Sequence, residues 1–100
     1  MPMTLIDLLK KIKVRPELYI GGKDIYALRH FLSGYVMAMR ENDHDYNDEV
    51  ITGFTAWLAE KYKDDRDYDW NTLISVHEVG LVNTDTFFRL MEEYQSECGR

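Results

Sequence analysis

Residues 15–35 read RPELYIGGKDIYALRHFLSGY, and this stretch decides how the chain folds. Pro16 pushes the residue before it out of helical dihedral angles, so a helix that precedes it has to end there. The glycine pair at 21–22 permits positive φ angles, and we therefore expect residues 17–23 to form a loop with a tight turn. Asp24 is a typical N-cap for the helix that follows. The stretch predicts two helices joined by a proline- and glycine-containing loop.

Hydrophobic periodicity extends this pattern over the whole chain. Apolar residues recur at steps of three and four, without the alternation typical of strands. The predicted helices cover residues 5–14, residues 25–41, a third segment ending near 62, a short fourth one that stops near Gly80, and a fifth one capped by Asn83 or Thr84. One hundred residues are one domain. We therefore predict an all-α fold, a compact single-domain bundle of about five helices.

Several local features sharpen this prediction. Thr4 and Asp7 have the spacing of a capping box, with Asp in place of the usual Glu. Gly34 lies inside the second predicted helix, where glycine costs about 1 kcal/mol relative to alanine, so we expect it to permit a close approach of another helix. We expect His30 on a helix surface and His77 partly buried near a helix end.

The charge of the chain is unevenly distributed. The net charge is −6, yet residues 1–15 contain four basic residues and a single acid. The acidic remainder disfavours nucleic acid and anionic membranes as partners and favours a basic one, although solubility alone also explains such a charge. No apolar run approaches the roughly 18 residues of a membrane span, and Cys98 is the only cysteine. These features predict a soluble cytoplasmic protein.

Two acidic loops resemble the start of a calcium-binding EF-hand loop. They read Asp43-x-Asp45-x-Asn47 and Asp65-x-Asp67-x-Asp69. An EF-hand loop needs glycine at its sixth position and glutamate at its twelfth. Neither loop has them: Asp48, Phe54, Trp70 and Val76 occupy these positions. We therefore predict helix-capping loops rather than a metal site, and no cofactor.

Catalytic patterns are equally weak. His30, His44 and His77 have no metal-ligand spacing, and the serines have no nucleophile-elbow pattern. Glu78 is the carboxylate whose flanking residues best suit an apolar setting with a raised pKa. We predict that the protein is not an enzyme and has no catalytic residues, while a small hydrolase or nucleotide-binding enzyme built from distant residues stays an alternative.

Residues 15–21, Arg-Pro-Glu-Leu-Tyr-Ile-Gly, resemble a signature of the gyrase-type ATPase domain, and Leu28-Arg29-His30-Phe31 is similar to its following Leu-His-His-Leu. In that family a glutamate base and a magnesium-binding asparagine come next. Gly34 and Ala38 occupy these positions here, so we predict no ATP binding.

A broader resemblance covers about residues 5–95. The chain resembles a group of small acidic bacterial proteins, some of which are similar to immunity proteins of polymorphic or contact-dependent toxin systems. The matching positions are residues 15–21, Leu28-x-x-Phe31-Leu32-x-Gly34-Tyr35, Phe54-x-x-Trp57-Leu58, Lys61-Tyr62, Trp70-x-x-Leu73-Ile74 and Phe87-Phe88-x-Leu90-x-x-x-Tyr94. The resemblance implies stoichiometric binding of a cognate toxin domain, commonly a basic nuclease. A regulatory or adaptor domain without a toxin partner is the alternative.

In an immunity protein of this kind, acids would steer a basic partner and aromatic rings would anchor it. Both acidic loops contain acidic and aromatic residues, although the aromatic rings also fit a structural role at the edge of the core. The predicted contact residues are Asp43, Asp45, Tyr46, Asp48, Glu49, Asp64, Asp65, Asp67, Tyr68 and Asp69. The identity of the toxin and the oligomeric state stay open.

Overall fold

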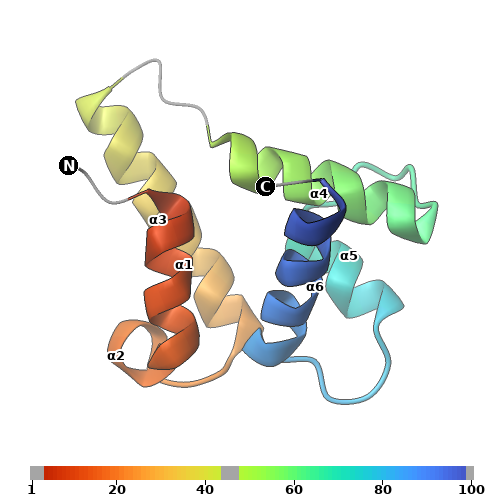
Figure 1. Ribbon diagram of the computed structural model, residues 1–100, viewed down its shortest axis with the longest axis horizontal. Coiled ribbons are helices and arrows are strands. Elements are labelled where there is room, and N and C mark those ends of the chain that lie inside the picture. Colours follow the sequence, from red (N-terminus) through yellow and green to blue (C-terminus); the bar gives the residue numbers. More distant parts are fainter. Residues whose placement is uncertain (1–3, 44–47, 99–100) are drawn as a thin grey trace.

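The fold is seen in a computed structural model that describes residues 4–43 and 48–98. Six helices follow one another in these ranges, and no strand occurs among the described residues (Figure 1). They are α1 (Leu5–Val14), α2 (Pro16–Ile20), α3 (Ile25–Asn42), α4 (Glu49–Tyr62), α5 (Trp70–His77) and α6 (Thr84–Glu97). The prediction of an all-α fold is confirmed. Asp45, Tyr46 and His44 lie outside the described residues.

The sixth helix, α2, replaces most of the loop predicted for residues 17–23. Pro16 ends α1 and also starts α2, because a fixed φ and a missing N–H suit the first position of a helix. Arg15, with φ −139° and ψ 71°, is the non-helical residue between the two helices. Gly21 ends α2 in the left-handed region at φ 78°. The loop prediction was therefore wrong for residues 17–20 and right for the glycine turn.

The helix starts follow the predicted caps. Thr4 and Asp7 form the reciprocal capping box at α1. The side chains of Asp24, Asp48, Asp69 and Asn83 accept hydrogen bonds from the first backbone N–H groups of α3, α4, α5 and α6. These bonds satisfy donors that have no partner inside the helix. The starts of these five helices are thus set by capping side chains, whereas α2 begins at Pro16 without one.

The core lies where α6 meets the other helices. α6 packs against α1, α3 and α4, while α4 and α5 pack closely on each other (Figure 1). Phe54 and Phe87 are fully buried and meet edge to face, with their ring centroids 5.4 Å apart. Four apolar residues of α1, namely Leu5, Leu8, Leu9 and Ile12, belong to the same core. The first and the last helix therefore close one hydrophobic core.

The glycine that permits a close contact is Gly53, and the prediction for Gly34 was wrong. A Cβ atom at Gly34 would have no neighbour within 4 Å. A Cβ atom at Gly53 would lie far inside contact distance of the Tyr94 hydroxyl. The side chain of Tyr94 on α6 rests on α4 at this point, beside Phe54 and Trp57.

Candidate functional site

The second acidic loop is only partly available to a partner, because Asp64 belongs to the interior. Its side chain is 3% exposed. Arg66 donates two side-chain hydrogen bonds to its carboxylate, and His77 Nε2 lies 2.7 Å from the same group. These bonds hold the pKa of Asp64 well below its ordinary value. Asp64 thus ties the end of α4 to the end of α5.

The polar network continues from His77 to α6. Tyr62 stacks on His77, with ring centroids 4.5 Å apart, and donates a 2.5 Å hydrogen bond to Glu78. Arg89 on α6 donates to the other oxygen of Glu78. Burial and the bond to Glu78 raise the pKa of Tyr62, so the phenol stays protonated and keeps donating. The ends of α4 and α5 are connected to the middle of α6 in this way.

Three predictions made from the sequence concern His77, His30 and Glu78. His77 is partly buried near a helix end and His30 is exposed, as predicted. Glu78 has no raised pKa; the hydrogen bond from Tyr62, followed by that from Arg89, lowers it. A lowered pKa suits an ion-pairing carboxylate and not a general acid at neutral pH. No group of three potential metal ligands occurs among the residues that the structure describes.

Asp48 and Asp69 are the N-caps of the helices that follow them. Asp48 is 7% exposed and caps α4. Asp69 caps α5 and also pairs with Arg29 of α3 at 2.8 Å. Tyr68 is 36% exposed and lies beneath the guanidinium of Arg66, 4.6 Å from its ring centroid. These three predicted contact residues therefore have structural roles of their own.

The other described acids of the predicted contact set are exposed. Asp43 follows the end of α3, Glu49 is the first residue of α4, and Asp65 and Asp67 follow the end of α4. A helix of 14 residues is about 21 Å long, so the structure does not bring the two acidic loops together. The outer face of α4 connects them. Of its exposed positions, Glu49, Thr52, Ala56 and Glu60 are spaced at three and four residues, and the fifth, Lys61, pairs with Glu93.

Glu60 was missed by the sequence reasoning. Glu60 lies eleven residues after Glu49, which is about three helical turns, so both residues share one face of the helix. This spacing could have identified Glu60 from the sequence. We call Glu49, Glu60, Asp65 and Asp67 the acidic edge. Their side chains make no hydrogen bond or ion pair within the described part of the chain. The α6 glutamates differ, because Glu92 pairs with Lys13 and Glu93 pairs with Lys61.

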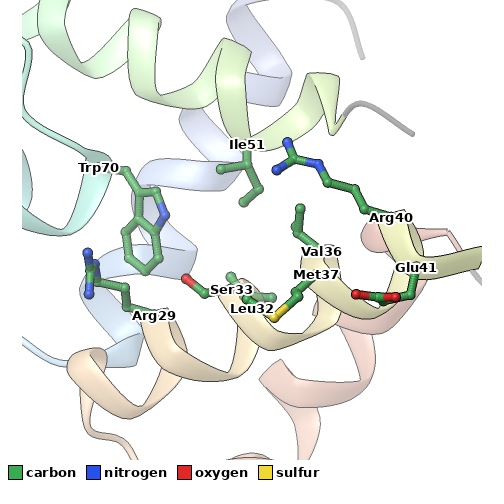
Figure 2. Close-up of a pocket in the computed structure, with 9 residues that line it drawn as sticks. All are labelled: Arg29, Leu32, Ser33, Val36, Met37, Arg40, Glu41, Ile51 and Trp70. Atoms are coloured by element: carbon green, nitrogen blue, oxygen red, sulfur yellow. The ribbon is translucent and has the colours of Figure 1, made fainter. Parts of the chain in front are cut away.

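A groove on another side of the molecule was not predicted at all. It has a volume of about 500 Å³ and lies between α3, α4 and α5. Figure 2 shows Ile51 and Trp70 facing Leu32, Val36 and Met37 across it. Arg29 and Arg40 lie toward its two ends, with Ser33 between them and Glu41 beside Arg40. Periodicity assigns Leu32 to the core of the fold and gives no sign that the neighbouring face of α3 stays uncovered.

No protein-family model matches this chain, and no curated protein or solved structure matches it significantly. None of the described helices is long and apolar enough to cross a membrane.

Proposed function

We propose that the protein neutralises a toxin domain by stoichiometric binding, as an immunity protein, and that the acidic edge is its contact surface. The observation that carries this proposal is the set of four unpaired carboxylates on the outer face of α4 and in the loop after it. Elsewhere many acids are engaged inside the fold, as Asp64, Asp69 and Glu78 show. The resemblance to small acidic immunity proteins supports the same function.

The shape of the acidic edge suits a large basic surface. Between Glu49 and Glu60 the outer positions of α4 carry the small side chains of Thr52 and Ala56. The two carboxylates are separated by about 16 Å along the helix axis. A partner could therefore lie close to the helix while its cations meet acids at both ends.

The basic clefts of nucleases fit such a surface, because they are built to bind phosphate. Carboxylates that occupy a phosphate-binding cleft exclude the substrate without any chemistry. Opposite charges also accelerate encounter well above the unsteered rate of about 10⁵–10⁶ M⁻¹s⁻¹. An immunity protein of this kind needs a Kd near nanomolar or below, equivalent to about −12 kcal/mol.

The test is co-expression with the protein domain encoded immediately upstream. We expect a one-to-one complex that survives a high-salt wash and protects cells from that domain. The paired substitution Glu49→Lys with Glu60→Lys, and separately Asp65→Lys with Asp67→Asn, should weaken binding at least 10-fold. Asn is chosen at 67 because this residue has φ 64°, which asparagine tolerates.

Glu17→Lys is the matched control, since Glu17 is an exposed acid on α2, away from α4 (Figure 1). It should leave binding unchanged. Absence of a complex would reject the immunity function. A tight complex that tolerates both paired substitutions would keep the function and reject the acidic edge as its contact surface.

The alternative is an adaptor domain that binds another protein more weakly. Val79 and Leu81, in the connection between α5 and α6, favour it: they are 94% and 85% exposed. Exposed apolar groups of this kind occur at protein contacts, although single ones are also common on ordinary surfaces. Micromolar affinity, and loss of binding on Leu81→Ser but not on the acidic-edge substitutions, would select the adaptor.

A further inference from the structure

We propose that the groove between α3, α4 and α5 binds an apolar helical segment of a partner protein, one that presents carboxylates to the groove. This proposal is independent of the acidic edge. It rests on the length of the groove, on the way α3 is packed, and on the donors that converge in it.

The groove has the dimensions of a short helix. Arg29, Ser33, Val36, Met37 and Arg40 follow one another at helical spacing on α3. Arg29 and Arg40 are eleven residues apart, which is about 16 Å along the axis. The occupant therefore makes about three helical turns, as in other complexes where an amphipathic helix lies in an apolar groove.

One flank of α3 has no neighbouring helix along this length. α3 packs against α2, α5 and α6, but it makes little direct contact with α4, although consecutive helices usually pack together. Met37 is 67% exposed as a result. Facing it across the groove are Ile51 and Trp70 (Figure 2). A helix placed there would bury apolar surface on three sides.

The polar groups in the groove are mainly donors. Trp70 is 5% exposed as a whole residue, but its indole N–H is accessible to solvent and donates to no acceptor in the described part of the chain. Figure 2 shows the indole nitrogen on the side of the ring that faces the groove. Ser33 and Arg40 likewise have no hydrogen-bond or ion-pair partner among the described side chains. An indole N–H can only donate, and so can a guanidinium.

Carboxylates are the acceptors that match this set. Arg40 provides a free charge, while Arg29 shares its charge with Asp69 and retains further N–H donors. Glu41 is the one acid that lines the groove; it lies on the Met37 side of α3 in Figure 2. An acid on the occupant therefore belongs between Arg40 and Trp70, whereas a lysine there would be repelled by the cationic side chains of Arg29 and Arg40.

The test uses a pair of side-chain-stapled helical peptides of about 15 residues. Stapling is needed because helices of this length are marginal in water. One peptide carries leucines on one face and glutamates near both ends of that face; its match carries lysines instead of the glutamates. Dodecanoate, a small amphipathic carboxylate, is the third probe. Fluorescence anisotropy measures binding of labelled peptide, and the shift of the Trp70 indole N–H resonance measures binding of dodecanoate.

We expect the glutamate peptide to bind at least 10-fold more tightly than the lysine peptide. The Trp70 indole N–H resonance, assigned with a Trp57→Phe variant, should shift on binding. Arg40→Glu and Met37→Glu should each weaken binding at least 10-fold, and both residues are exposed enough for the fold to tolerate the change. Lys11→Glu changes the charge equally on α1 and should have no effect.

Four outcomes overturn the proposal. They are equal affinity for the two peptides, no binding at millimolar concentration, binding that leaves the Trp70 resonance in place, and binding of dodecanoate alone. The last result would assign the groove to a small amphiphile. None of them bears on the acidic edge, whose variants keep the groove intact.

Discussion

At the scale of single residues, Gly34 and Gly53 show that one residue type has opposite roles in two helices. Both lie in helix interiors and neither has a positive φ. Open space surrounds Gly34, whereas the Tyr94 hydroxyl occupies the space where a Cβ atom of residue 53 would be. Glycine therefore destabilises the helix at position 34, whereas at position 53 it is required for the packing of Tyr94.

We predict that Gly34→Ala stabilises the protein by about 1 kcal/mol, because alanine restricts the unfolded chain and favours the helix. Gly53→Ala should give no gain or a loss, because Tyr94 packs against Phe54 and Trp57 and has to move. Urea unfolding measures both. Adding Tyr94→Phe to Gly53→Ala removes the hydroxyl and should restore part of the gain; equal gains for both single substitutions would contradict the Tyr94 contact.

The second prediction at this scale concerns the buried carboxylate. Asp64→Asn should lower the midpoint of thermal unfolding by roughly 5–15 °C, because it leaves Arg66 and His77 without their shared anion. Asp65→Asn is the control: it makes the same change at the neighbouring, exposed residue and should shift the midpoint by less than about 2 °C. Similar midpoints for the two variants would mean that the Asp64 network contributes little to stability.

Sequence reasoning grouped Asp64 with its neighbours because all of them lie in one run of acids. Nothing local separates Asp64 from Asp65. The difference arises from His77, thirteen residues away, which the packing of α5 on α4 brings to Asp64. A contact made by tertiary packing cannot be seen in a pattern of charges.

At the scale of the elements, the caps explain why the helix boundaries could be predicted. A capping residue and the first apolar position of a stripe are both visible in the sequence, and Thr4, Asp24, Asp69 and Asn83 all start helices as expected. α2 was missed because five residues do not complete two helical turns, so no periodicity can develop. Pro16 then predicts only the end of the preceding helix, although it also starts the next one.

The prediction for an element concerns the cap of α5. Asp69→Ala should destabilise the protein by about 1–2 kcal/mol, through loss of the bond to the Thr72 N–H at 2.9 Å and of the pair with Arg29. The pair adds little, since both of its side chains are about 40% exposed. Chemical denaturation gives the value, with Asp65→Ala as the control outside a cap. Asp69→Asn retains a capping oxygen and should recover most of the loss.

At the scale of the whole molecule, three hydrogen-bonded carboxylates make the free energy of unfolding depend on pH. Bonds from Arg66 and His77 lower the pKa of Asp64, and those from Tyr62 and Arg89 lower the pKa of Glu78. Burial opposes the same change at Asp69, but hydrogen bonds from Thr72 and Arg29 outweigh it and lower its pKa as well. At low pH the folded protein therefore binds fewer protons than the unfolded chain.

We predict full stability above about pH 5 and a progressive loss as the pH falls through about 4 and below, because the unfolded carboxyl groups take up protons first. The urea midpoint measured from pH 7 to pH 3 shows this. Asp64→Asn removes one of the three groups, so its midpoint should depend less steeply on pH over the acidic range. A midpoint that stays constant down to pH 3 would contradict the lowered pKa values.

The placement of α1 against α6 has a consequence for synthesis of the protein on the ribosome. Ile12 is fully buried in a core that Phe87 and Leu90 of α6 complete. While α6 is still inside the exit tunnel, α1 lacks one of the helices that it packs against, so its core side chains Leu5, Leu8, Leu9 and Ile12 are incompletely covered. The part of the core around α1 is therefore complete only after α6 has emerged, although α4 and α5 can pack on each other earlier.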